Sequence, residues 1–119
     1  MFEVKIQTSF SSAHRLLNYK GKCENLHGHN WKVEVYARGE NLDSSNILID
    51  FKLLKKEVNE IIEYLDHKYL NDLEEFKDKS PSSEFIAKYI YKKAKEKFEN
   101  ISRVDVWETE TSRASYFEE

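Results

Sequence analysis

The stretch HGHNWKVEVY, residues 27–36, combines a strand pattern with two closely spaced histidines. From Trp31 onward its apolar and polar side chains alternate, which is the pattern of a strand with one buried face. At its start, His27 and His29 stand two positions apart, so on an extended chain both imidazoles point to the same side. A strand and a pair of potential metal ligands therefore share one short segment.

A second alternating segment precedes this strand. Residues 2–7 (FEVKIQ) place three apolar side chains on one side, whereas residues 11–30 show little periodicity. The aperiodic connection holds Cys23 and three of the four histidines. Because functional residues concentrate on connections between rigid elements, we expect the chemistry of this protein to lie there.

Two helical patterns follow a turn region at residues 39–46. Asp50 is expected to cap the first helix, and the apolar stripe of that helix comprises Phe51, Leu54, Val58, Ile61 and Leu65. After a polar connection at residues 70–79, the second helix is expected to begin at Ser80-Pro81, with Ser80 as its cap. Its apolar stripe comprises Phe85, Tyr89, Ala94 and Phe98, and Asn100 ends it.

Alternation resumes at residues 101–107, and a turn through 110–113 returns the chain into a short final strand at 115–117. The order is strand, strand, helix, helix, strand, strand. This order predicts an α+β fold, in which a four-stranded antiparallel sheet carries both helices on one face. Such a sheet has two open edges, which proteins commonly cover or use for assembly.

Length and composition fit one compact domain spanning residues 1–119. The mean hydropathy is −0.76, but aromatic residues make up 13% of the chain and argue against disorder. No apolar run is long enough to span a membrane, and the net charge of −3 argues against a nucleic-acid partner. A single cysteine excludes an intrachain disulfide and favours a cytoplasmic location.

Three histidines form a candidate metal site. His14 follows the first strand, and if the two strands pair, it lies at the same end of the sheet as His27 and His29. Three neutral imidazoles suit Zn²⁺ and leave a fourth position for water or substrate. Two alternatives remain open: the histidines bind no metal, or Cys23 closes the tetrahedron as a fourth ligand in a structural site.

Other reactive groups lie outside the histidines. A zinc ion nearby would favour the thiolate of Cys23 and suit it to move protons near neutral pH. Asp66 can orient the imidazole of His67, provided that a loop conformation brings these neighbours together. Either Glu108 or Glu110, near the end of the third strand, can accept two parallel N–H bonds from a guanidine-like ligand edge.

Together these segments resemble the 6-pyruvoyl-tetrahydropterin synthase superfamily, and most of all its 6-carboxytetrahydropterin synthase branch. The matching motifs span nearly the whole chain: Phe10-Ser11-Ser12-Ala13-His14-Arg15-Leu16, Cys23-x3-His27-Gly28-His29-Asn30, Ile49-Asp50-Phe51, Leu65-Asp66-His67-Lys68-Tyr69-Leu70-Asn71, Pro81-Ser82-Ser83-Glu84 and Glu108-Thr109. The resemblance implies a tunnelling fold, in which subunits join their sheet edges into an oligomeric barrel. It also implies a trimer or a dimer of trimers with active sites at the interfaces.

The resemblance also implies roles for individual residues. His14, His27 and His29 resemble the zinc ligands, and Cys23 resembles the catalytic thiol. Asp66 and His67 resemble the partners of this thiol in proton transfer, and Glu108 matches the glutamate that grips the pterin. The three-residue gap between Cys23 and His27 is similar to that of the carboxy-forming branch. A further branch has glutamate in place of the cysteine, and Glu24 stands directly beside Cys23 in this chain.

The implied activity is that of a zinc-dependent lyase. It would convert 7,8-dihydroneopterin triphosphate into 6-carboxy-5,6,7,8-tetrahydropterin, acetaldehyde and triphosphate, in queuosine-type 7-deazapurine biosynthesis. From charge alone, Arg15, Lys20 and Lys22 are candidates for binding the triphosphate. The alternatives are 6-pyruvoyl-tetrahydropterin synthesis, which eliminates triphosphate without carbon–carbon cleavage, and a non-catalytic zinc-stabilised assembly module.

Overall fold

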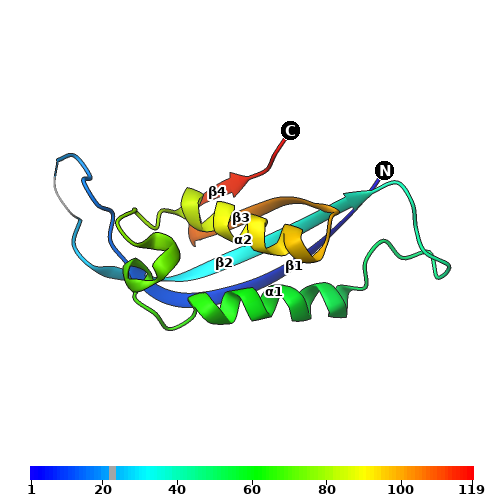
Figure 1. The fold of residues 1–119 in the computed structure, drawn as a ribbon, viewed down its shortest axis with the longest axis horizontal. Helices are drawn as coiled ribbons and strands as arrows, with labels where there is room; N and C mark the ends of the chain where they lie inside the picture. Colours follow the sequence, from blue (N-terminus) through cyan, green and yellow to red (C-terminus); the bar gives the residue numbers. More distant parts are fainter. Residues whose placement is uncertain (22–23) are drawn as a thin grey trace.

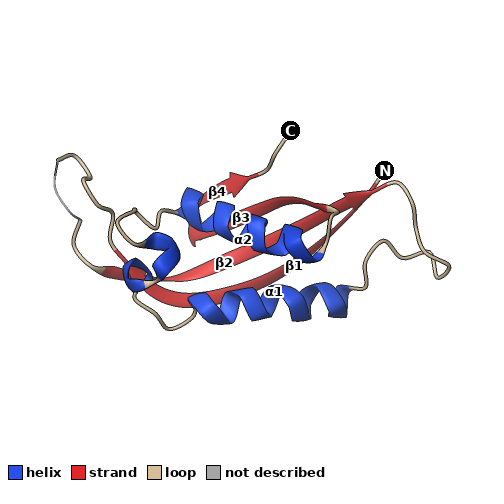
Figure 2. Cartoon of the chain, viewed as in Figure 1, coloured by secondary structure: helices blue, strands red, loops and turns tan. Residues whose placement is uncertain are grey.

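A long curved sheet backed by two helices forms the body of the protein (Figures 1 and 2). The computed structural model describes residues 1–21 and 24–119. Its strands are β1 (Phe2–His14), β2 (His27–Gly39), β3 (Ile101–Thr109) and β4 (Ser112–Tyr116), and its helices are α1 (Phe51–Leu65) and α2 (Ser83–Lys97). Two short 3₁₀ turns, η1 (Leu70–Asp72) and η2 (Glu74–Phe76), lie between the helices.

The sheet has the order β1-β2-β3-β4, and every neighbouring pair is antiparallel. The predicted α+β fold with the order ββααββ is therefore confirmed. β1 and β2 pair over their whole length without a register shift, from Phe2 opposite Gly39 to His14 opposite His27. β1 and β4 are the two edges of the sheet.

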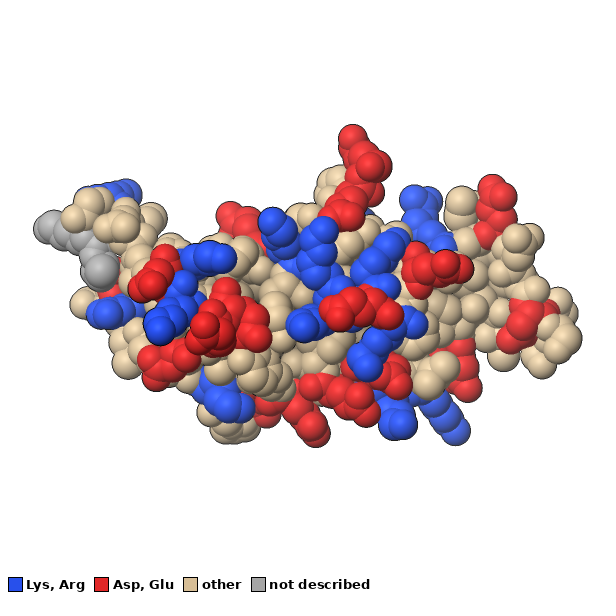
Figure 3. Space-filling model, in the orientation of Figure 1, with Lys and Arg blue, Asp and Glu red and all other residues tan. Residues whose placement is uncertain are grey.

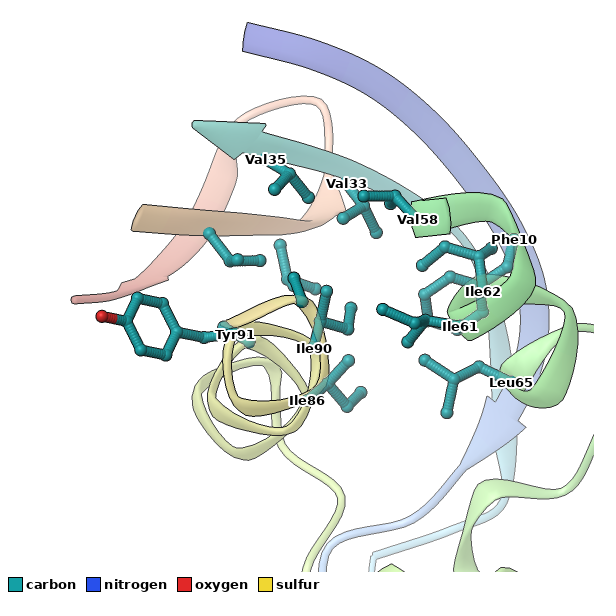
Figure 4. Close-up of a cluster of buried hydrophobic side chains, with 14 of the residues drawn as sticks. Phe10, Val33, Val35, Val58, Ile61, Ile62, Leu65, Ile86, Ile90 and Tyr91 are labelled. Atoms are coloured by element: carbon teal, nitrogen blue, oxygen red, sulfur yellow. The ribbon is translucent and has the colours of Figure 1, made fainter. Parts of the chain in front are cut away.

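The apolar core lies between the sheet and the helices, as Figure 4 shows. Phe10, Val33 and Val35 extend from the strands toward residues such as Ile62 of α1 and Ile90 of α2. Since side chains of a strand alternate between faces, the opposite face of the same strands carries the polar residues. One face of the sheet is thus covered by the helices and the other is left uncovered by them.

Both early strands are longer than the sequence predicted. The connection that the sequence predicted over residues 11–30 in fact contains the end of β1, up to His14, and the start of β2, from His27. The strand ends were missed because they consist largely of Ser and His residues, which do not alternate between apolar and polar. Continuous pairing with β2 nevertheless extends β1 as far as His14. The final strand is also displaced, because β4 spans Ser112–Tyr116 instead of residues 115–117.

α1 begins as predicted, with the Asp50 carboxylate accepting a hydrogen bond from the Lys52 N–H at 2.9 Å. Of its predicted stripe, Leu54, Val58, Ile61 and Leu65 are buried, whereas Phe51 in the first turn is 56% exposed. The prediction for Phe51 was therefore wrong.

The predicted start of the second helix was also wrong. Ser82, not Ser80, caps α2 by accepting a hydrogen bond from the Phe85 N–H. Ser80 instead bonds to the backbone of Leu17, and Pro81 lies before the helix. The buried stripe of α2 is also shifted from the prediction: it comprises Ser83, Ile86, Ala87, Ile90, Tyr91 and Ala94, while Phe85, Tyr89 and Phe98 are only partly buried.

Neither helix is long and apolar enough to span a membrane, within residues 1–21 and 24–119. In the view of Figure 3, cations and carboxylates intermix over the face that carries α2. Among the described residues, this face therefore carries both signs of charge side by side (Figure 3).

Candidate metal centre

Three imidazoles meet at the end of the β1–β2 hairpin. His14 and His27 are directly opposite in the register, and His29 lies two positions further along β2, on the same face. The ring centroids are 4.6 to 5.3 Å apart. The predicted convergence of the three histidines is confirmed, and the fully paired hairpin is what produces it.

Two backbone carbonyls define the proton positions on two of these rings. His14 Nδ1 lies 2.8 Å from the Pro81 carbonyl oxygen, and His27 Nδ1 lies 2.9 Å from that of Asn25. Because a carbonyl only accepts hydrogen bonds, each Nδ1 carries the proton and donates it. In the neutral rings, each Nε2 therefore keeps its lone pair, which is the arrangement that second-shell partners impose on histidine ligands of metals.

The two lone pairs face each other, since His14 Nε2 lies 3.0 Å from His27 Nε2. Neutral imidazoles with protonated Nδ1 atoms have no proton to share across this contact. A cation placed between them would turn the repulsion into attraction. The two rings are therefore preorganised for a positive charge.

The third ring adds a further unsatisfied nitrogen. His29 Nε2 is buried and makes no hydrogen bond, although it lies 3.1 Å from Glu108 Oε1. Burial lowers the pKa of His29, and His14 and His27 lower it further, against the opposing effect of Glu108. His29 is thus biased toward the neutral form that binds metal ions.

The donor set fits a divalent ion such as zinc. One ligand atom from each of His14, His27, His29 and Glu108 lies within 4.8 Å of the others. In a tetrahedral zinc site with bonds of about 2.0–2.1 Å, neighbouring ligand atoms are about 3.3 Å apart. The observed separations of 3.0 and 3.1 Å are close to this value.

Trp31 forms the floor of the cluster. Its fully buried indole lies edge-on to His14 and His29, with centroids 4.8 and 5.0 Å away, and its Nε1 donates to the Ser12 carbonyl. Phe10 stacks on the same indole at 5.8 Å. The aromatic residues that build the core thereby also hold the imidazoles in place.

Glu108 and Glu110, which the sequence did not distinguish, lie in different environments. Glu108 joins the histidines, and its Oε2 accepts a hydrogen bond from Ser83 Oγ at 3.1 Å. Glu110 lies in the turn after β3 and lines a cavity of about 470 Å³ together with Lys32 and Trp107. The register shift between Trp107 and Thr109 breaks the alternation that would have aligned the two glutamates.

Asp66 and His67 are in direct contact, through the kind of loop conformation that the sequence analysis made a condition for it. His67 has a φ of 54°, which turns its ring back so that Nδ1 lies 2.9 Å from Asp66 Oδ2. A hydrogen bond from the Ser11 N–H, and then one from His67, lower the pKa of Asp66. This pair is not part of the histidine–Glu108 group, and the His67 side chain is 82% exposed.

The segment at residues 66–69 also occupies part of the β1 edge. The His67 N–H donates to the Ser11 carbonyl, the Ala13 N–H donates to the Lys68 carbonyl, and Ala13 bridges Tyr69 in parallel. The Asp66–His67 pair is therefore attached to the same strand that ends in His14.

The predicted phosphate-binding residues lie on the connection that follows His14. Arg15 is exposed there. Its backbone N–H donates to Asn71 Oδ1 at 3.0 Å, and its carbonyl accepts from Asn71 Nδ2 at 2.9 Å. The Lys20 ammonium group lies over the Tyr19 ring, and the backbone of Lys20 has a positive φ of 52°. Lys22 and Cys23, the candidate cation and the candidate catalytic thiol, lie outside the described residues.

Glu24 closes the base of this connection. Its N–H donates to the Leu16 carbonyl, and its carboxylate accepts from the Leu16 N–H at 3.1 Å. The same carboxylate lies 3.7 Å from His27 Nδ1, but that nitrogen donates to the closer carbonyl of Asn25. Glu24 thus has a clear structural task in the loop.

The sequence did not reveal three groups that hold the site: the Pro81 and Asn25 carbonyls and the Ser83 hydroxyl. No side-chain pattern marks a carbonyl that accepts from a histidine. Ser83 lies within the motif Pro81-Ser82-Ser83-Glu84, but only the packing of α2 against β3 shows that its hydroxyl contacts Glu108.

Comparisons with known proteins agree with this geometry. Residues 3–119 match the family description of 6-pyruvoyl tetrahydropterin synthase. A 6-carboxy-5,6,7,8-tetrahydropterin synthase of Synechocystis is 37% identical over 123 residues, covering 98% of this chain and 94% of the relative. A protein of the same name from Haemophilus influenzae is 32% identical over 141 residues, covering 99% of this chain and 100% of the relative.

A solved structure agrees as well. The 6-pyruvoyl tetrahydropterin synthase of Caenorhabditis elegans has a TM-score of 0.88 at 32% identity, covering 99% of this chain and 96% of the other. The names of these relatives divide between two activities on one fold. The match over almost the entire chain shows that this protein belongs to the 6-pyruvoyl tetrahydropterin synthase family.

Proposed function

We propose that this protein is a zinc-dependent 6-carboxy-5,6,7,8-tetrahydropterin synthase. It converts 7,8-dihydroneopterin triphosphate into 6-carboxy-5,6,7,8-tetrahydropterin, acetaldehyde and triphosphate, and supplies queuosine-type biosynthesis in the cytoplasm. The observation that carries the proposal is the convergence of three histidine Nε2 atoms beside Glu108, in a chain whose relatives bear this name.

His14, His27 and His29 would hold the zinc ion. When bound, Zn²⁺ supplies a positive charge that stabilises negative charge developing on substrate oxygens. Glu108 would receive the amino-pyrimidinone edge of the pterin, because its carboxylate can accept two parallel N–H bonds. Ser83 holds one of its oxygens and thereby fixes the orientation of the carboxylate.

Proton transfer would fall to Cys23 with Asp66 and His67. Asp66 contacts His67 Nδ1 at 2.9 Å, which leaves Nε2 as the atom that exchanges a proton. Arg15, Lys20 and Lys22 would face the triphosphate, since these cations belong in the sequence to the connection between His14 and His27.

The active form is proposed to be a homo-oligomer, a trimer or a dimer of trimers, with active sites between subunits. Two features support it: β1 and β4 are the edge strands of the sheet, with residues 66–69 occupying only one end of β1, and the exposed His67 can serve a site built with another copy. Sedimentation velocity of the zinc-loaded protein measures the state, and a purely monomeric active enzyme would contradict it.

The decisive experiment is product analysis after incubating the zinc-loaded protein with 7,8-dihydroneopterin triphosphate. Acetaldehyde together with a 6-carboxy pterin is the expected result. A 6-pyruvoyl product with triphosphate and no acetaldehyde would assign the sister activity, which the C. elegans structure favours by its similarity. Absence of turnover in a metal-replete, assembled sample would leave the non-catalytic module.

Cys23→Ala separates the catalytic thiol from a structural ligand. We expect this variant to keep its zinc and to lose turnover, because the three histidines with Glu108 already form a ligand set. Zinc content by metal analysis and product release are measured on the same sample. Loss of zinc would instead support the structural Cys-His₃ site.

A further inference from the structure

Glu108 lies in a position that the proposed substrate role does not explain. Binding a pterin does not by itself require Glu108 to lie against the histidines in the free protein. Yet Glu108 Oε1 lies 3.1 Å from His29 Nε2, and no hydrogen bond joins the two atoms. Its place beside the three imidazoles is that of a fourth metal ligand.

The charges favour the same interpretation. A divalent ion held by three neutral imidazoles keeps its full charge of +2, which is costly in a site where His14 is only 1% exposed. One carboxylate offsets half of that charge. Histidine and glutamate together form a ligand set that zinc accepts.

Four protein ligands, however, close a zinc site, whereas catalysis needs an open position. Glu108 is the ligand best suited to leave. Its side chain is 36% exposed, and it alone among the four is not held by a backbone carbonyl or buried against Trp31. Ser83 Oγ already binds its other oxygen, Oε2, so the carboxylate keeps one partner when Oε1 is released.

We propose that Glu108 is a ligand that the substrate exchanges: it completes the metal shell with His14, His27 and His29 in the free protein, and moves onto the pterin when substrate binds. This inference rests on the proposed function. It links recognition of the pterin to the opening of the metal site, so that a coordination position becomes available only when the substrate is in place.

Cobalt(II) is the probe, because its visible absorption reports the number and type of ligands. We expect the wild-type protein to bind Co²⁺ at least about tenfold more tightly than Glu108→Gln, and the two to differ in spectrum without pterin. Adding 7,8-dihydroneopterin is expected to change the wild-type spectrum by removing the carboxylate. Glu110→Gln is the matched control, since Glu110 lies on the turn beside a different cavity, and its affinity and spectrum stay those of wild type.

Ser83→Ala tests the second half of the proposal. It is expected to leave the pterin-free cobalt spectrum unchanged and to weaken dihydroneopterin binding about fivefold, the value of one hydrogen bond. Ser83→Thr, which keeps the hydroxyl, is expected to restore the affinity. Thermal unfolding of each variant establishes that it is folded.

Each outcome has one meaning. Equal cobalt affinity and equal spectra for wild type and Glu108→Gln would overturn this inference and leave the pterin product assay unaffected. Failure of the wild type to bind Co²⁺ or Zn²⁺ at all would overturn both this inference and the zinc-dependent function. Tighter binding and a distinct spectrum for wild type, in a protein that turns over no pterin, would support the ligand role and contradict only the function.

Discussion

The two faces of the sheet bury polar groups in opposite ways. On the uncovered face, Glu34 and Asp105 stand directly opposite each other, and both are buried. Like charges in such a pair repel, but here each carboxylate has its own donors. Lys5 and Trp107 bond to Glu34, while Arg103, Arg113 and Ser115 contact Asp105.

On the covered face, the Nε2 atoms of the histidine cluster have no comparable donors or acceptors among the described residues. His14 and His27 donate their Nδ1 protons to carbonyls and keep lone pairs that face each other at 3.0 Å. His29 Nε2 has no hydrogen bond at all. Paired charges of this kind stabilise a fold, whereas imidazole lone pairs that face each other mark a candidate ligand site.

Removing a carboxylate from the charge-paired network around Asp105 is expected to have the largest effect on folding. Asp105→Ala leaves Arg103 and Arg113 facing each other, and we expect a loss of about 3 kcal/mol in the free energy of unfolding. Urea denaturation measures it. Asp105→Asn, which keeps an acceptor, should cost about half as much, and an unchanged midpoint for Asp105→Ala would show that the network contributes nothing.

Removing one imidazole from the histidine cluster is expected to affect metal binding instead. His27→Ala should weaken zinc affinity by roughly 100-fold or more, measured by competition with a chelating dye. Zinc should also raise the unfolding temperature of wild type but not of this variant. His67→Ala is the control, because His67 is outside the cluster; equal zinc affinity for wild type and His27→Ala would contradict the assignment.

The smallest expected effect is a dependence on pH. Burial would raise the pKa of Glu34, but hydrogen bonds from Lys5 and Trp107 outweigh it and leave the pKa below its ordinary 4.5. A lowered folded-state pKa contributes stability that is complete above pH 4.5 and is lost as the pH falls through the folded value. Lys5 stays charged throughout, because its own pKa is raised by Glu34.

Urea denaturation of wild type and Glu34→Gln between pH 3 and pH 7, as an approximate range, measures this dependence. The difference in the free energy of unfolding should be constant above pH 4.5 and should shrink below it. A difference that does not change with pH would show that the charge of Glu34 makes no contribution.

Much of this fold could be predicted from local sequence patterns: alternation for the strands, apolar stripes and capping residues for the helices. The order of the elements, the Asp50 cap and the convergence of the histidines all follow from local patterns. The strand ends could not be predicted, because Ser11, Ser12 and His14 have little strand preference by themselves and are held by pairing with β2. The start of α2 was wrong because both Ser80 and Ser82 can cap, and the contact of Ser80 with Leu17 decides between them.

The site shows the same division. The candidate ligand residues were visible as residue types at characteristic spacing, but the separation of Glu108 from Glu110 depends on a register shift that no spacing reveals. The role of Ser83 depends on the packing of α2 against β3. Local sequence therefore predicts which groups are present, and tertiary pairing determines which of them meet.

The segment at residues 66–69 also sets a limit on what can join the β1 edge. Residues 11 and 13 bond outward to it, so by alternation the outward backbone groups of residues 3, 5, 7 and 9 are those left for another strand. An added strand that runs past residue 9 meets the Asp66–His67 turn and must stop. The turn that holds His67 against Asp66 thus acts as a register marker, fixing how far a neighbouring strand can slide along this edge.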